Sequence, residues 1–268
     1  MQWNQQICFL TGASGGIGQA IAHALVNKGA KLILNGRNES QLRALCAKLP
    51  GTHEYLAADL SDKAQREMVI AELNARDDVT MLINNAGVAG FNPIENVTGD
   101  NLETLLNINL NSPIQLIQGV LPSLKRRDKA SIINVGSTFG SIGFPCFSTY
   151  CASKFGLRGF TEALQRELAD SSVNVLYLAP RTTSTSINSA TVDEMNQALG
   201  NQVDSPDVVA QALIQQLESG KLRVFVGWPE KLFVKINGAF PNLVDNALLK
   251  KLPIIKKFAS KIPLEANS

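Results

Sequence analysis

The chain has 268 residues, of which 45% are hydrophobic and 18% are charged, and its formal net charge is +2. This composition predicts one large globular domain with a full core, and it excludes extensive disorder. A charge this close to neutral, without an arginine-rich run or an aromatic platform, argues against a nucleic-acid partner.

Cysteine and histidine are too few and too scattered to indicate a metal centre or a disulfide framework. The four cysteines show no C-x-x-C spacing, and only two histidines accompany them. Buried free thiols in a reducing compartment are the simpler interpretation. The N-terminus lacks a signal-peptide pattern and no apolar run is long enough to span a bilayer, so we expect a cytoplasmic protein.

Short apolar runs alternate with longer segments of helical period. Runs that are apolar on both faces and separated by helices are typical of a parallel sheet covered on both sides. We therefore predict a single α/β domain over residues 1–228, with a Rossmann-type, doubly wound sheet of seven parallel strands. The predicted strands are residues 6–10, 31–35, 54–58, 79–84, 130–136, 173–179 and 223–227.

A glycine-rich loop, "TGASGGIG", joins the first strand to the first helix. Glycines at these positions allow a tight turn, the close approach of backbone to a pyrophosphate, and close packing of the helix on the sheet. An ordinary strand-to-helix turn is the alternative, but the position after the first strand favours dinucleotide binding. The residues expected to contact the cofactor here are Gly12, Ser14, Gly15, Gly16, Ile17 and Gly18.

The end of the second strand indicates which dinucleotide is bound. Folds that prefer NAD carry an acidic residue there, whereas this chain has Asn35 and Gly36, followed by Arg37. An arginine can pair with a 2′-phosphate that an acid would repel, so we predict NADP(H). The alternative is that Arg37 is a solvated loop charge.

Tyr150 and Lys154 lie four residues apart in "STYCASKF" and would share one face of a helix. A nearby ammonium favours the phenolate, so the pair predicts a proton donor whose pKa is lowered. A solvated surface helix would give the same spacing, and the motif alone is weak evidence.

With these motifs the chain resembles the short-chain dehydrogenase/reductase family, in its single-domain branch. "NNAG" follows the fourth strand, "NINLNSP" and "INVGSTFG" come next, and "YCASK" completes a series that runs in order over residues 6–228. The resemblance implies four catalytic residues: Asn109, Ser137, Tyr150 and Lys154. The further cofactor contacts that it implies are Asp59, Leu60, Asn85, Ala86, Gly87, Tyr150, Lys154, Pro180 and Thr185.

The resemblance also implies a role for each catalytic residue. Tyr150 would deliver a proton as negative charge develops on the carbonyl oxygen, and Ser137 would hold that oxygen. Lys154 would tune the phenol and bond the nicotinamide ribose, while Asn109 would position a water in a proton relay. Loop capping and local backbone bonding are the structural alternatives for Ser137 and Asn109.

One residue departs from the family pattern after the sixth strand. Arg181 stands where the family usually has glycine, in "APRTTSTSI". Either its guanidinium reaches a phosphate or an anionic substrate group, or it points to solvent. The polar segment 181–205 that begins there is long enough to form a mobile lid.

Apolar residues flank the expected acceptor site, and they favour a lipid-like, acyl or alicyclic carbonyl substrate over a sugar. We therefore predict an NADPH-dependent carbonyl reductase, with a non-catalytic NADP-binding sensor on the same fold as the alternative. The resemblance implies a homo-oligomer. The flanking residues are Val88, Ala89, Phe91, Phe139, Phe144, Pro145 and Phe147.

Residues 229–268 form a basic C-terminal extension with seven lysines and three acids. The pattern predicts two short amphipathic helices separated at Pro253, one with Leu243, Val244, Ala247 and Leu248 on a face, the other with Ile254, Ile255, Phe258 and Ile262. Such helices dock either on protein or, peripherally, on an anionic membrane, and docking on protein is the commoner outcome.

Overall fold

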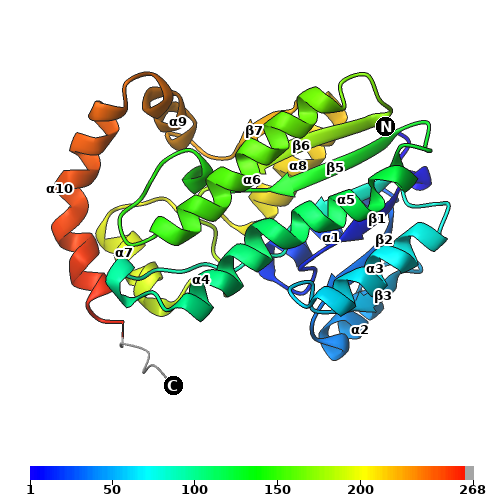
Figure 1. The fold of residues 1–268 in the computed structure, drawn as a ribbon, viewed down its shortest axis with the longest axis horizontal. Coiled ribbons are helices and arrows are strands. Elements are labelled where there is room, and N and C mark those ends of the chain that lie inside the picture. The colour runs from blue at the N-terminus through cyan, green and yellow to red at the C-terminus, as the bar shows by residue number, and fades with distance from the viewer. Residues whose placement is uncertain (263–268) are drawn as a thin grey trace.

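In a computed structural model, which describes residues 1–262, the seven predicted strands form one parallel sheet (Figure 1). Their order is β3-β2-β1-β4-β5-β6-β7, which confirms the predicted Rossmann-type fold. The strands are β1 (Ile7–Leu10), β2 (Lys31–Gly36), β3 (Glu54–Ala57), β4 (Met81–Asn84), β5 (Ala130–Val135), β6 (Val173–Ala179) and β7 (Arg223–Phe225).

Helices connect the strands and cover both faces of the sheet. In the described residues they are α1 (Gly16–Asn27), α2 (Glu39–Lys48), α3 (Lys63–Ala75), α4 (Gly99–Leu106), α5 (Ser112–Leu124), α6 (Ser148–Glu167), α7 (Ala190–Ala198), α8 (Pro206–Ser219), α9 (Glu230–Ala239) and α10 (Pro241–Ala259). No helix in this part of the chain is both long and apolar enough to cross a membrane.

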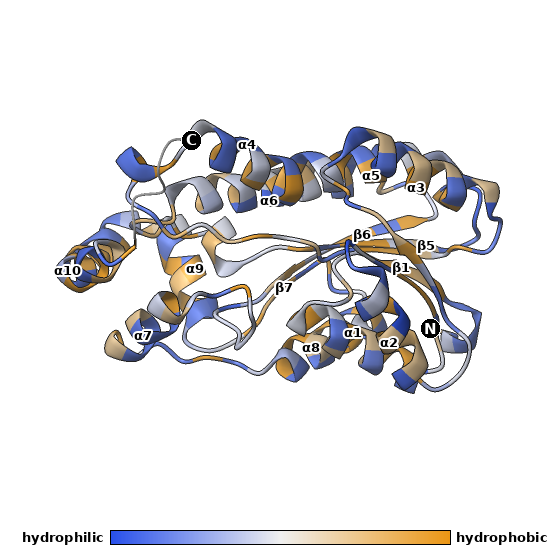
Figure 2. Ribbon diagram, turned by 90° about the horizontal axis from the view of Figure 1, so that it is seen from below, coloured by the Kyte–Doolittle hydropathy of each residue, from blue (hydrophilic) through white to orange (hydrophobic). Residues whose placement is uncertain are grey.

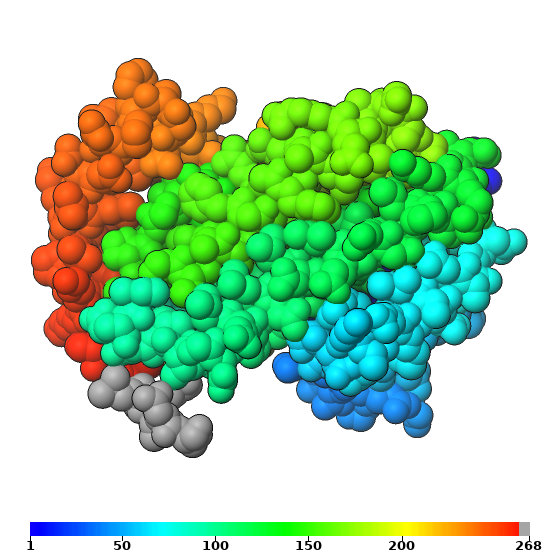
Figure 3. Space-filling model, in the orientation of Figure 1, coloured from blue at the N-terminus to red at the C-terminus, as the bar shows by residue number. Residues whose placement is uncertain are grey.

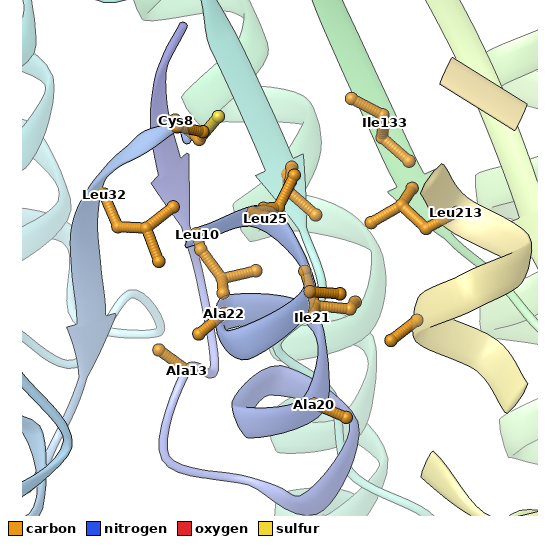
Figure 4. Packing of buried hydrophobic residues seen from close by; sticks show 14 of the residues in the cluster. Cys8, Leu10, Ala13, Ala20, Ile21, Ala22, Leu25, Leu32, Ile133 and Leu213 are labelled. Atoms are coloured by element: carbon orange, nitrogen blue, oxygen red, sulfur yellow. The ribbon is translucent and has the colours of Figure 1, made fainter. Parts of the chain in front are cut away.

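The strands bury apolar side chains on both faces. On β1, Cys8 and Leu10 belong to one core and Phe9 to the other. Helices α1, α2 and α8 cover the first face, and α3, α5 and α6 cover the second (Figure 2). Figure 4 shows the first core, where Ile21 and Leu25 of α1 lie among the side chains that pack between the helix and the sheet. Burial on both faces explains why the strands are continuous apolar runs in the sequence.

The direction of winding reverses between β1 and β4. The chain builds β1, β2 and β3 outward on one side, then returns to place β4 against the other edge of β1. The loops after these two strands diverge, which opens a crevice at their carboxyl ends. The candidate site therefore lies where the glycine loop meets the "NNAG" segment.

The C-terminal extension forms two helices, but their junction is not at Pro253 as predicted. The chain bends at Phe240, and α10 runs unbroken through Pro253. A residue before proline is disfavoured in the helical region, while proline fits the first position of a helix, so Pro241 starts α10. Burial of Ile255 and Phe258 keeps the chain helical beyond Pro253. The last six residues of the extension lie outside the described part.

Helix α10 docks on the body of the protein through its second half. Ile255, Phe258 and Ala259 join an apolar cluster with Val192 and Met195 of α7, and a Lys261–Glu194 ion pair of 2.9 Å closes the contact. Both views place α7, α9 and α10 at the same end of the molecule (Figures 1 and 2). The predicted faces are correct only in part, because Leu243 and Ile254 are exposed.

Candidate functional site

The glycine loop leaves β1 in a conformation that other residues adopt with difficulty. Gly12 has a φ of +62°, and a Cβ atom there would lie 2.8 Å from Ala86 Cα. A Cβ on Gly16 would lie 2.8 Å from Thr185 Cγ2, and one on Gly18 would overlap the Gly12 carbonyl. Helix α1 begins beyond Gly15 with no side-chain cap, so its first N–H groups face the loop. This cradle fits a pyrophosphate.

A threonine that the sequence analysis did not single out holds the two loops of the crevice together. Thr11 Oγ1 accepts hydrogen bonds from the backbone N–H groups of Asn85 and Ala86, both at 2.9 Å. In return, the Asn85 side chain donates to the carbonyl oxygens of Thr11 and Gly12. The first residue of "TGASGGIG" is thus a structural link between β1 and β4.

The end of β2 presents an arginine to the crevice, and Asn35 also lies at the cleft wall, with its side-chain amide bonded to β3. Asn35 is buried, and its side chain donates to the Leu56 carbonyl at 2.9 Å, which ties β2 to β3. Gly36 leaves room for the Ser14 hydroxyl, and exposed Arg37 lines the cleft beside it. No carboxylate occupies the position where NAD-binding folds carry one.

The loop after β3 closes the far side of the crevice. The Asp59 carboxylate accepts hydrogen bonds from the N–H and hydroxyl of Ser61 at 2.9 and 2.7 Å. Buried Arg66, which the sequence analysis missed, donates to the Leu60 carbonyl at 2.6 Å. These contacts fix the loop that would border an adenine ring.

The structure brings nearly all predicted cofactor residues to one cleft of about 520 Å³. The predicted residues that lie at its wall are Gly12, Ser14, Gly15, Gly16, Ile17, Gly18, Arg37, Asp59, Leu60, Asn85, Ala86, Gly87 and Thr185. Tyr150, Lys154 and Pro180 line a second, smaller pocket of about 130 Å³. Gly87 and Thr185 belong to both walls, so the pocket continues the cleft.

Tyr150 and Ser137 face this smaller pocket from α6 and from the turn after β5. Burial raises the pKa of the Tyr150 phenol to about 12, and a hydrogen bond with the Ser137 side chain offsets this in part. The predicted lowering of the Tyr150 pKa by Lys154 is therefore wrong for this structure, because desolvation raises that pKa and the group that opposes the rise is Ser137. The phenol keeps its proton near neutral pH, which is the form a proton donor needs.

Lys154 lies one turn further along α6, as the spacing predicts. Its Nζ donates to the Val135 carbonyl at 3.2 Å and sits 5.7 Å from the centroid of the Tyr150 ring. Burial lowers the pKa of this ammonium to about 8. Its charge is therefore sensitive to pH in a range where the phenol is not.

Asn109 lies behind the pocket wall instead of lining it. It is in a π-helical turn, Asn107–Asn111, and its amide bonds both the N–H and the carbonyl of Val88 at 2.8 Å. The same amide donates to Ser153 Oγ at 3.1 Å, and that hydroxyl donates to the Tyr150 carbonyl. Asn109 therefore bonds partners outside its own helix and is tied to the Tyr150 segment.

The acceptor side of the pocket is mainly apolar, as the sequence predicts, and Asn188 and Asn196 are among its polar residues. Its wall includes Val88, Ala89, Phe139, Phe144 and Phe147, together with Val192 and Met195 from α7. Phe91 lies behind it, with its ring 4.9 Å from that of Phe147, and Pro145 is not at the wall. Helix α7 arises within the segment expected to be a lid, so part of that lid is ordered helix.

Arg181 neither points to solvent nor offers a free guanidinium to a ligand. It forms a bidentate pair with Asp204 at 2.7 and 2.9 Å, and it donates to Glu230 and to the Trp228 carbonyl. Its stem packs on Gly227, where φ is +93° and a Cβ would lie 2.6 Å from Arg181 Cδ. Arg181 thus joins the lid segment to the start of α9.

The comparisons with known proteins agree with this fold and geometry. Residues 6–196 match the short chain dehydrogenase family model, so the chain belongs to the short-chain dehydrogenase/reductase family of oxidoreductases. A curated relative, the 3-oxoacyl-[acyl-carrier-protein] reductase FabG of Salmonella typhimurium, is 31% identical over 204 residues, which cover 76% of this chain and 84% of the relative.

Two solved structures show the same architecture. A short-chain dehydrogenase from Sphingobium yanoikuyae in complex with NADPH has a TM-score of 0.78 and 26% identity, and the match covers 90% of this chain and 95% of that one. A metagenomic short-chain oxidoreductase in complex with NADP has a TM-score of 0.70 and 28% identity, covering 83% of this chain and 96% of that one. The chain is therefore an oxidoreductase with a Rossmann fold.

Proposed function

We propose that the protein is a cytoplasmic, homo-oligomeric, NADPH-dependent carbonyl reductase that acts on an apolar ketone or a 3-oxoacyl-type group. The observation that carries this proposal is the position of the Tyr150 and Ser137 hydroxyls in an apolar pocket that opens into the dinucleotide cleft. A carbonyl carbon in that pocket would lie beside the shared wall of Gly87 and Thr185. The relatives named 3-oxoacyl reductase support the acyl class of substrate.

Each catalytic side chain has a defined task in this proposal. NADPH, when bound, supplies the hydride. The Tyr150 phenol donates its proton to the carbonyl oxygen while the Ser137 hydroxyl holds that oxygen. The Lys154 ammonium stabilises the resulting phenolate and bonds the ribose. Asn109 keeps the Val88 loop and the Tyr150 segment at a fixed distance.

The test is NADPH oxidation by the purified full chain against 3-oxoacyl thioesters, alicyclic ketones, quinones and aldehydes, with NADH as the comparison. Turnover of an apolar member with NADPH supports the proposal. Tight NADPH binding without turnover of any compound would instead favour the non-catalytic sensor.

Cofactor choice is expected to depend on Arg37. Its loss removes a charge-assisted contact with the 2′-phosphate, so Arg37→Ala should raise the KM for NADPH about 10-fold or more and leave the KM for NADH unchanged. Steady-state kinetics with both cofactors measure this. A solvated loop charge would predict equal KM values for the variant and the wild type, and Arg43→Ala on exposed α2 is the matched control.

The Thr185 hydroxyl is expected to bind the cofactor. The Thr185 Oγ1 atom is buried and has no hydrogen-bond partner among the described residues. The residue lines both the cleft and the pocket. A buried hydroxyl without a partner costs free energy until a ligand satisfies it. Thr185→Val should therefore leave the melting temperature equal or higher and weaken NADPH binding several-fold, as measured by cofactor fluorescence. Lower stability with unchanged binding would contradict this.

The rate of reduction is expected to fall above about pH 8. Because burial lowers the pKa of Lys154 to about 8, the free enzyme loses this ammonium as the pH rises through that value, while Tyr150 stays protonated. The pH profile of kcat/KM reports groups of the free enzyme, so one falling limb near pH 8 should appear. A profile that stays flat to about pH 10, with the fold intact, would remove Lys154 from this role.

A further inference from the structure

The C-terminal helices expose large apolar side chains that the rest of the described chain leaves uncovered. Helix α9 has no buried residue, and Trp228, Phe240 and Leu243 are each more than 60% exposed. Leu232, Phe233, Leu249 and Ile254 are exposed in the same segment. In Figure 3 these helices form a ridge along one edge of the molecule. Apolar exposure of this density marks an interaction surface.

Lysines alternate with these apolar residues. On α10 one stripe repeats at steps of four and three residues, which places its members on one flank of the helix beside the buried face of Val244, Ile255 and Phe258. The stripe consists of Leu243, Ala247, Lys250, Ile254 and Lys257, and Lys261 follows just beyond the end of the helix. Two of the acids nearby are already paired, Glu230 with Arg181 and Glu194 with Lys261.

We propose that this surface, Trp228 to Lys261, binds an anionic lipid bilayer. Its apolar side chains would enter the headgroup region, while the lysines reach lipid phosphates on their flexible stems. A second copy of the chain fits less well, because a symmetric contact of this surface with itself would bring lysines against lysines. Residues 229–268 carry seven lysines against three acids, whereas residues 1–228 carry 18 basic and 20 acidic residues.

The proposed lipid-binding surface adjoins the acceptor pocket, so lipid binding would affect which substrates reach that pocket. Arg181 lines that pocket and bonds Glu230 and the Trp228 carbonyl at the start of the ridge. Phe258 packs in the cluster behind Phe147 and Met195, which are part of the pocket wall. Lipid attachment would therefore bring the pocket close to apolar substrates dissolved in the bilayer. This last step rests on the proposed function, whereas lipid binding does not.

The experiment is co-sedimentation of the full chain with vesicles of phosphatidylcholine and phosphatidylglycerol, compared with pure phosphatidylcholine. Phe240→Ser with Leu243→Ser should weaken the partition coefficient at least about tenfold, because the buried apolar area is lost. Lys250→Gln with Lys257→Gln should weaken it about 30-fold, at about 1 kcal/mol for each lysine. Met68→Ser with Val208→Ser removes exposed apolar groups on α3 and α8 and is the matched control.

Binding to anionic vesicles that high salt weakens, that both tail variants lose and that the control keeps would support the proposal. Equal melting temperatures for all variants would show that the loss is not unfolding. Absence of binding, or equal binding to neutral vesicles, would overturn it. Concentration-dependent self-association lost in the tail variants, with the wild type left in the supernatant, would assign the surface to a second copy. Tyr150→Phe should bind vesicles as the wild type does, which separates this result from catalysis.

Discussion

Replacing Tyr150 with phenylalanine is expected to lower kcat for carbonyl reduction about 10²- to 10⁴-fold, the usual contribution of a positioned general acid. The substitution removes the one hydroxyl that can give its proton to the substrate oxygen from this position. It keeps the ring, whose edge contacts with Phe139 and Phe147 have centroid distances of 6.3 and 6.1 Å. NADPH affinity and melting temperature should therefore stay close to the wild-type values.

The matched control is Tyr55→Phe, because Tyr55 bonds exposed Glu39 far from the pocket. Steady-state kinetics and cofactor fluorescence on both variants separate chemistry from binding. If Tyr150→Phe kept the wild-type kcat, the proton would have to come from another group.

Arg181→Ala is expected to destabilise the protein by about 3 kcal/mol, because it leaves the Asp204 carboxylate buried and unpaired. Both side chains of this ion pair are only about a tenth exposed. For a domain of this size the loss corresponds to a melting temperature lower by about 6–12 °C. The KM for the carbonyl substrate should rise as well, since the lid segment loses its tie to α9.

Arg76→Ala provides the comparison for Arg181→Ala. Arg76 also bonds two carboxylates, those of Glu54 and Asp78, but both are at least 40% exposed. Exposed ion pairs contribute about 1 kcal/mol or less to the free energy of unfolding, so the melting temperature of Arg76→Ala should stay close to that of the wild type. Thermal unfolding of both variants measures the difference, and equal shifts would show that burial of the Arg181–Asp204 ion pair does not set its contribution to stability.

The sequence predicted the fold well because each strand is apolar on both faces. Runs such as Lys31–Gly36 cannot be surface strands, and their separation by helices leaves a parallel sheet as the arrangement that covers them. The C-terminal junction was predicted wrongly because proline was read only as a helix breaker. At Pro241 it begins a helix, and at Pro253 tertiary burial of Ile255 overrides it.

The candidate site was predictable where motif residues follow strand ends, since carboxyl ends of neighbouring strands meet at one edge of the sheet. The energetics of the site were not predictable in this way. The spacing of Tyr150 and Lys154 predicts that the two side chains lie close together, but it does not predict how deeply they are buried. Desolvation by burial is the largest cause of both pKa shifts. The ion-pair partners of Arg181 are Asp204 and Glu230. They lie too far from it along the chain for a sequence motif to predict the contact.

The packing of Arg181 on Gly227 links two positions that are 46 residues apart. A Cβ atom at position 227 would overlap the Arg181 side chain in its present place, and the φ of +93° there favours glycine. A larger residue at 227 would displace the arginine side chain, and the Asp204 carboxylate would then lose its partner in the ion pair. A substitution at position 227 would therefore act on the Arg181–Asp204 ion pair, although Gly227 itself carries no charge.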